Sequence, residues 1–108
     1  MIGLNFFKDR DNAEDLALLT NGTVIDPTAI TRVVLIPSNG TAIDSDDSPE
    51  MFEWPVDVET GVFQGKKVIR LKLGSSELAT GLSYCSLVTY DPTNPNGFVW
   101  GDLQITMN

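Results

Sequence analysis

Histidine is absent from the sequence, and Cys85 is its single cysteine. A lone cysteine forms neither an internal disulfide nor a multi-cysteine metal site. Without histidine the commonest general base is missing, and the sequence also has no Gly-rich phosphate loop and no Ser-centred nucleophile elbow. Cys85 lies in the strand-like run Tyr84 to Tyr90, with no histidine in the sequence to activate it, so we interpret it as a small core residue rather than a reactive thiol. We expect no enzyme activity and no cofactor.

Basic residues are scarce: seven Lys and Arg stand against fifteen Asp and Glu, for a net charge of −8 and a pI near 4.1. Such a chain repels phosphate backbones and anionic lipid surfaces, so neither nucleic acid nor a membrane is an expected partner. Apolar runs such as Val33 to Ile36 are far shorter than the roughly twenty residues of a membrane-spanning helix. The N-terminus lacks the pattern of a secretory signal, so we expect the protein to act where it is made.

Turn signals recur at short intervals and divide the chain into strand-length pieces. They are Asn21-Gly22, Asn39-Gly40, Thr60-Gly61, Gly74-Ser75, Thr80-Gly81 and Asn96-Gly97. Asn21-Gly22 tolerates positive φ angles and separates two β-prone segments, which predicts a tight type I′ hairpin. We expect at most a helical turn at Ser75 to Leu78 or Asn12 to Leu16. The spacing predicts one all-β domain over residues 1–108, an antiparallel sandwich or small barrel of seven to eight strands, with residues 1–13 as an N-terminal arm or edge strand.

Period-two alternation predicts which side chains are buried. Ile69, Leu71 and Leu73 alternate with Arg70 and Lys72, as in a strand with one face buried. The predicted core comprises Ile69, Leu71, Leu73, Val88, Leu103 and Ile105.

Three further segments have assignable strand faces. Phe52 to Val58 alternates in the same way but contains Pro55, so it should be an edge strand or carry a bulge. The segment Ile30 to Ile36 ends in consecutive apolar residues, so both of its faces are apolar there. We therefore expect it to be a central strand. Near the C-terminus we expect one face of Val99, Leu103, Ile105 and Met107 and an opposite face of Trp100, Asp102, Gln104 and Thr106.

The motif Leu78-x-x-Gly81-x-x-Tyr84 fits a tyrosine corner, in which the hydroxyl bonds back to the backbone just upstream. This favours an antiparallel immunoglobulin-like sandwich and gives Tyr84, Gly81 and Leu78 a structural role.

The stretch "IDSDDSP" begins like a calcium loop, with Asp44, Asp46 and Asp47 close together. Counted from Asp44, however, prolines occupy position 6, which needs glycine, and position 12, which needs glutamate. We therefore predict a solvated acidic turn and no metal; an irregular cation site that includes Glu50 is the alternative.

Charge is segregated along the chain. Residues 33–65 contain seven acids and no Lys or Arg, and then Lys66, Lys67, Arg70 and Lys72 follow together. One interpretation is cross-strand ion pairing within the domain. The other is docking, in which the acidic region of one copy meets the basic region of a neighbour or another protein.

The Pro- and Asn-rich loop that starts at Asp91 leads to Phe98 and Trp100. These aromatic residues, with Trp54, are candidate interface anchors, because desolvated aromatic side chains dominate binding energy. The alternative is a small carbohydrate-binding module that uses Phe98 and Trp100 with the nearby Asn94 and Asn96.

Across roughly residues 14 to 107 the sequence resembles the small immunoglobulin-like proteins and N-terminal modules of tailed-bacteriophage particles, including the baseplate-upper and tail-accessory types. The stretches that carry the resemblance are Asp15-Leu16-Ala17-Leu18, "VIDPTAITRVVL", "IDSD" and "IRLKLGSSELATGLSYCSLVTYDPTNPNGFVW". The resemblance implies a non-enzymatic virion component, assembled in the bacterial host cytoplasm. It would decorate the capsid or dock on neck, tail or baseplate, with other phage structural proteins and copies of itself as partners.

Overall fold

The computed structural model describes residues 2–38 and 40–108. Within them the chain is built of strands and two short 3-10 helices, so the all-β prediction is confirmed. The elements in order are β1 (Ile2–Phe6), β2 (Glu14–Leu16), β3 (Leu19–Thr20), β4 (Thr23–Val24), η1 (Pro27–Ala29), β5 (Arg32–Pro37), β6 (Ile43–Asp44), η2 (Pro49–Met51), β7 (Phe52–Asp57), β8 (Lys67–Leu71), β9 (Gly81–Tyr90) and β10 (Phe98–Met107). Among the described residues no helix is long and apolar enough to cross a membrane.

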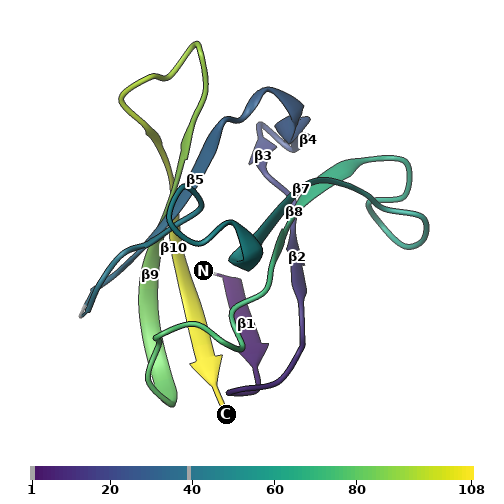
Figure 1. The fold of residues 1–108 in the computed structure, drawn as a ribbon. Helices are drawn as coiled ribbons and strands as arrows, with labels where there is room; N and C mark the ends of the chain where they lie inside the picture. Colours follow the sequence, from purple (N-terminus) through teal and green to yellow (C-terminus); the bar gives the residue numbers. More distant parts are fainter. Residues whose placement is uncertain (1, 39) are drawn as a thin grey trace.

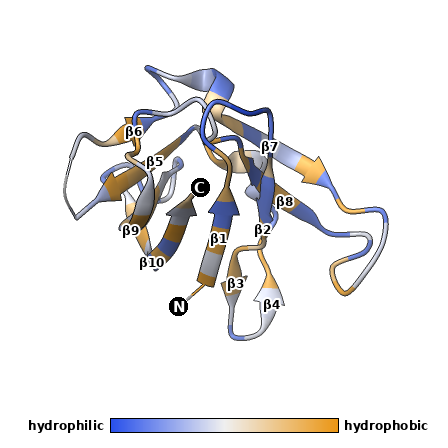
Figure 2. Ribbon diagram, turned by 90° about the horizontal axis from the view of Figure 1, so that it is seen from below, coloured by the Kyte–Doolittle hydropathy of each residue, from blue (hydrophilic) through white to orange (hydrophobic). Residues whose placement is uncertain are grey.

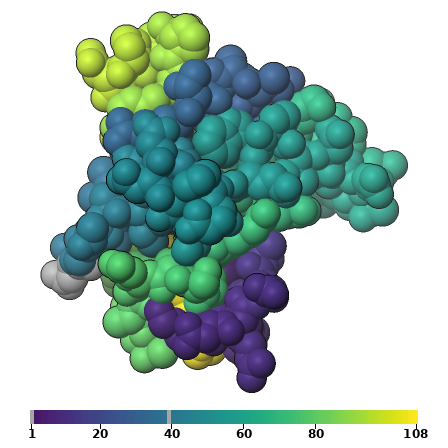
Figure 3. All heavy atoms as spheres, in the orientation of Figure 1, coloured from purple at the N-terminus to yellow at the C-terminus, as the bar shows by residue number. Residues whose placement is uncertain are grey.

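The strands form two main sheets and one small hairpin (Figure 1). The larger sheet has the order β1-β10-β9-β5-β6, the smaller has the order β2-β8-β7, and β3 pairs with β4. We had expected purely antiparallel pairing. That expectation is wrong, because β1 lies parallel to β10. The connections β7–β8 and β9–β10 project from the body of the molecule (Figure 3).

Strand β1 pairs with β10 because this position buries its apolar side chains. Leu4 and Phe6 are buried in the common core, and β1 occupies the edge of the sheet beside β10. The link to β2 is fastened to the segment around Gly74: Asp9 N–H donates to Gly74 O (2.8 Å), and Lys8 Nζ donates to Ser76 O (2.5 Å). No local sequence signal encodes this long-range pairing.

One hydrophobic core lies between the two sheets. Leu35 and Ile105 of the larger sheet and Ile69 and Leu71 of the smaller belong to one buried cluster. The hydropathy colouring changes from residue to residue along β10, as expected for a strand with one buried face (Figure 2). The predicted core residues Ile69, Leu71, Leu73, Leu103 and Ile105 belong to this cluster, which confirms that part of the prediction. Val88 is buried as predicted, but it lies on the opposite face of β9 and outside the cluster. Cys85 is buried as well, and burial raises the pKa of its thiol.

Several local predictions are also confirmed. The β3–β4 hairpin turns at Asn21 and Gly22, which have φ angles of +51° and +78°. Strand β7, with Pro55, lies at a sheet edge and shifts register between Glu53 and Val56. Strand β5 lies between β9 and β6. Asn39 of the predicted Asn39-Gly40 turn lies outside the described residues.

Two expectations need correction. Neither segment expected to allow a helical turn forms one: Ser75 to Leu78 is a non-helical turn, with Ser76 Oγ bonded to Leu73 O (2.7 Å), and Asn12 to Leu16 leads into β2. The 3-10 helices instead begin at Pro27 and Pro49. A bulge between Val99 and Gly101 reverses the faces at the start of β10. Val99 is therefore exposed, whereas Trp100 packs against the core.

Candidate functional site

The two tryptophans proposed as interface anchors both serve the fold. Trp100 Nε1 donates a 2.8 Å hydrogen bond to Oγ1 of the buried Thr89, and Trp54 Nε1 donates one of 2.8 Å to Ile30 O. Both rings are partly buried against the core. Phe98 is more exposed and lies 4.7 Å from Trp100, centroid to centroid, at an interplanar angle of 55°. The two rings therefore do not form one flat surface on which a sugar ring would stack.

The basic residues around β8 pair with acids on the neighbouring strands. Lys67 Nζ lies 2.7 Å from Asp57 Oδ1, and this hydrogen bond raises the pKa of Lys67. Arg70 bridges the other two strands of its sheet, at 2.9 Å from Asp15 and 3.4 Å from Glu53. Lys72 Nζ lies 4.0 Å from Glu53, and Lys66 has no ion pair among the described residues. This geometry favours the cross-strand interpretation of the segregated charge.

The acidic turn is organised around an arginine. Arg32 Nε donates to Asp44 Oδ1 (3.0 Å), Arg32 Nη2 donates to Asp44 Oδ2, and Asp46 lies 3.4 Å from the same guanidinium. The hydrogen bonds from Arg32 hold the pKa of Asp44 below its usual range. Asp44 O in turn accepts from the backbone N–H of Asp47 (3.1 Å) and Ser48 (2.8 Å). Across residues 2–38 and 40–108, no group of three or more acids, histidines or cysteines is placed to hold a metal ion.

Tyr84 does not form the expected corner. Its side chain is 44% exposed in the interior of β9, opposite Gln104. Gly81 begins β9 with a φ of +106°, and Leu78 is buried upstream of it. On β9 the odd-numbered Cys85 and Leu87 face the core, so Tyr84 faces outward. Motif spacing alone does not reveal which face a tyrosine occupies.

Sequence reasoning missed an apolar patch on the outer face of the larger sheet. We call it the outer-face patch; its members are Ile36, Leu82, Tyr84 and Val99, each between 44% and 63% exposed. Ile36 pairs with Ser86 and Val99 with Val88, and these partners share the β9 face of Leu82 and Tyr84. The alternation of Leu82 and Tyr84 was visible in the sequence, but the contribution of Val99 depends on the bulge.

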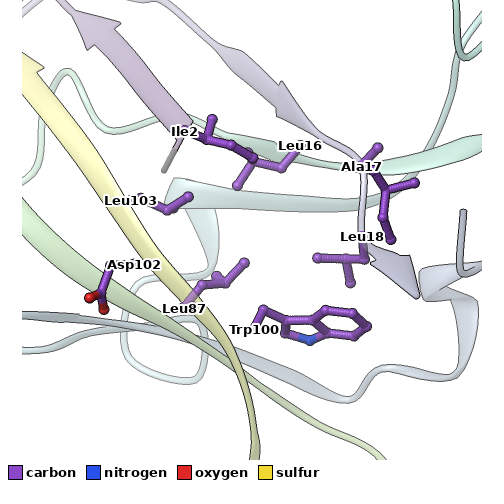
Figure 4. A pocket seen from close by; sticks show the side chains of 10 residues that line it. Ile2, Leu16, Ala17, Leu18, Leu87, Trp100, Asp102 and Leu103 are labelled. Carbon is purple, nitrogen blue, oxygen red and sulfur yellow. The ribbon is translucent and has the colours of Figure 1, made fainter. Parts of the chain in front are cut away.

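A second apolar feature opens between the sheets beside the start of β1. This seam groove encloses about 490 Å³, and Figure 4 shows the side chains around it. Buried Leu18 and Leu87 and the Trp100 ring line it, with the exposed Ile2 and Leu19 at its rim. The carboxylate of Asp102 is directed away from the groove and bonds to Ser86 Oγ on the outer face (Figure 4). Its chemistry suits burial of apolar groups, since Asp102 is the one charged residue among the described residues that line it.

Comparisons with protein-family models, with curated proteins and with solved structures find no significant match to this chain.

Proposed function

We propose that this chain is a non-enzymatic structural accessory protein of a tailed-phage virion. It docks on the head, neck, tail or baseplate and stabilises or connects other particle proteins. The sequence resemblance supports the virion assignment, and the strand order and the outer-face patch support a scaffold that binds other proteins.

The strand order supports an immunoglobulin-like sandwich. When β2, β5, β6, β7, β8, β9 and β10 take the places B, C, C′, D, E, F and G, the smaller sheet has the order B-E-D and the larger contains G-F-C-C′. These are the neighbour relationships of the immunoglobulin fold, with the extra C′ strand of its variable type. The first strand departs from the constant-type arrangement, because β1 joins β10 rather than β2.

The outer-face patch is the observation that carries the docking proposal. Leu82, Tyr84 and Ile36 are neighbours on this face, and Val99 lies beyond the hydrogen-bonded pair of Ser86 and Asp102. Exposed apolar side chains gathered on one face of a domain mark protein interaction sites. Most of the segregated charges form ion pairs within the domain, so they contribute little binding energy to a partner. Apolar burial on the patch therefore supplies the affinity, and the net charge of −8 keeps free copies apart.

The experiment is purification of virions followed by mass spectrometry of their proteins. We expect the chain in intact particles, and its absence from them would reject the proposal. Leu82→Lys places a charge in the patch and should prevent incorporation. Val62→Lys changes an equally apolar residue that is 96% exposed in the β7–β8 loop and should leave incorporation unchanged. Equal incorporation of both variants would place the docking surface elsewhere.

A further inference from the structure

We propose that β1 pairs edge to edge with β1 of a second copy of this chain, so that two larger sheets join into one continuous sheet across a two-fold axis. The interface lies apart from the outer-face patch, and the inference does not rest on the virion assignment. Three features carry it: an unprotected edge, a self-complementary register and the lack of charge on β1.

The strands at the edges of the two main sheets differ in how they are protected against pairing with another chain. Strand β7 carries Pro55 and a register shift, and β2 and β6 have only three and two residues and carry acids. Each of these features discourages the addition of a strand. Strand β1 has five residues, Ile2–Phe6, without proline, charge or register shift. Among the main-sheet edges in the described part of the chain, β1 is therefore the one open to a further strand.

The hydrogen bonds at the end of β1 show that its even-numbered residues face β10. Asn108 N–H donates to Phe6 O, and Lys8 N–H donates to Asn108 O, each at 2.8 Å. In a parallel pair the N–H and C=O of one residue point toward the neighbouring strand, and those of the next residue point away from it. The odd-numbered Gly3 and Asn5 therefore direct their backbone groups to the free edge of β1.

The free edge ends at Phe7, whose backbone is already bonded. Phe7 N–H donates to Asn12 Oδ1, and Phe7 O accepts from Asn12 Nδ2, each at 3.1 Å. Gly3 and Asn5 are exposed, and no strand or loop of residues 2–38 and 40–108 bonds to their outward backbone groups. Two N–H donors and two C=O acceptors are thus left for a partner strand.

A second copy of β1 satisfies all of these groups. When two β1 strands run antiparallel about a two-fold axis at Leu4, Gly3 of each copy stands opposite Asn5 of the other. Opposite residues in a hydrogen-bonded antiparallel pair exchange both of their N–H···O bonds. The two symmetry-related pairs therefore use every free donor and acceptor of Gly3 and Asn5.

The same register also matches the faces of the two strands. On β1 the even-numbered side chains point into the space between the sheets, whereas Gly3 and Asn5 point outward. A two-fold axis perpendicular to the sheet keeps like faces together, so Ile2 of one copy stands opposite Phe6 of the other. Ile2 is 50% exposed in the single chain, and pairing removes part of this apolar surface from water.

Charge favours a second copy at this edge, although the chain carries −8 overall. Strand β1 and its partners on β10, Leu103 to Met107, contain no charged residue, so the paired strands oppose no like charges. Strand β2 lies on the free side of β1 (Figure 2), and its Asp15 pairs with Arg70 at 2.9 Å. Its Glu14 has no ion pair among the described residues and adds to the long-range repulsion. This chain thus supplies the uncharged, alternating strand that its own edge requires, and closed two-fold dimers are the commonest assemblies of identical chains.

The test begins with sedimentation velocity of the full chain between about 1 µM and about 1 mM. We expect a monomer–dimer equilibrium with a Kd on the order of 10–100 µM, because an interface between two short edge strands is small. The dimer should become tighter as salt is raised, since salt screens the repulsion between two acidic chains. A chain that stays monomeric at about 1 mM would overturn the assignment to a second copy.

Variants of Asn5 locate the interface. Asn5→Pro removes an N–H that faces the free edge and leaves the bonds from β1 to β10 in place, so it should weaken dimerisation at least about tenfold. Asn5→Ala is the matched control, because it loses the same side chain but keeps the backbone donor, and it should dimerise like the wild type. Wild-type dimerisation of Asn5→Pro would reject pairing through β1. Equal loss in both variants would show that the side chain holds the copies together, which would overturn strand pairing.

Hydrogen exchange of the unaltered chain gives a second test that does not depend on whether Asn5→Pro folds. The amides of Gly3 and Asn5 should exchange several-fold more slowly at about 1 mM than at about 10 µM, whereas the amide of Leu4, bonded to β10, should be protected at both concentrations. In a mixture of isotope-labelled and unlabelled chains, an intermolecular NOE between Ile2 and Phe6 would confirm the register. A dimer in which Gly3 and Asn5 gain no protection would place the interface elsewhere and overturn the proposal.

Discussion

The indole Nε1 of Trp100 donates its hydrogen bond to the hydroxyl of Thr89, a side chain that is only 1% exposed. The bulge that makes Trp100 an extra residue in β10 also turns its ring onto the core. Trp100 therefore belongs to the fold as well as to the lining of the seam groove.

We expect Trp100→Phe to lower the free energy of unfolding by about 1–3 kcal/mol, because it leaves the buried Thr89 hydroxyl without its donor. Thr89→Val in the Trp100→Phe background should then cost less than in the wild type. Urea unfolding of all four proteins measures this coupling. Strictly additive effects would mean that the hydrogen bond contributes no net stability.

Leu71→Ala should lower the free energy of unfolding by about 2–5 kcal/mol, because Leu71 is fully buried between the sheets and its truncation leaves a cavity. Val62→Ala, in the exposed β7–β8 loop, should change it by less than about 0.5 kcal/mol. Thermal or urea unfolding of both variants provides the comparison. Similar effects of the two changes would contradict the assigned core.

Gly74→Ala should destabilise the fold by about 1–3 kcal/mol or more through overpacking. An added Cβ would lie 2.0 Å from Arg10 O, so the link between β1 and β2 would have to move. Gly3→Ala is the matched control, since nothing lies within 4 Å of its added Cβ. Urea midpoints should separate the two variants, and an unaffected Gly74→Ala protein would show that this link is not closely packed.

Tyr84→Phe should leave the free energy of unfolding within about 0.5 kcal/mol of the wild type, because the Tyr84 side chain is 44% exposed on the outer face of β9. A tyrosine corner would instead lose on the order of 1 kcal/mol. Chemical denaturation distinguishes the two cases. Tyr84→Lys should preserve the fold but reduce incorporation into particles if the outer-face patch docks.

Asp44 should contribute to acid unfolding. The hydrogen bonds from Arg32 lower its pKa in the folded state below the ordinary 3.8, so its contribution is fully present above that value. The contribution is lost as the pH falls through the lower, folded pKa. Asp44→Asn should therefore be less stable at neutral pH and should lose less stability than the wild type below about pH 4.

The control for this prediction is Asp47→Asn, which removes an exposed carboxylate that has no ion pair among the described residues. It should keep the acid dependence of the wild type. Unfolding free energies measured in urea across a pH series test both variants. An unchanged pH profile for Asp44→Asn would show that the Arg32 pair does not couple protonation to folding.

Features that the sequence determined by itself rest on local chemistry. Asn and Gly readily take positive φ angles, so Asn21-Gly22 indicates a turn by itself. Pro55 has no backbone N–H to donate to a neighbouring strand, wherever its own strand lies. Period-two alternation identified Ile69, Leu71 and Leu73 as core residues, because one strand presents only two faces. The spacing of turn signals likewise predicted the all-β class, and composition alone set the acidic character.

Only the tertiary structure decided what depends on register between distant strands. The parallel pairing of β1 with β10 joins the two ends of the chain, and the bulge at Trp100 exchanges the faces of Val99 and Trp100. Arg70 could not be assigned to Asp15 and Glu53 until three strands were side by side. The seam groove and the outer-face patch likewise exist only where such strands meet, because a one-residue shift in pairing moves every side chain of a strand to its other face.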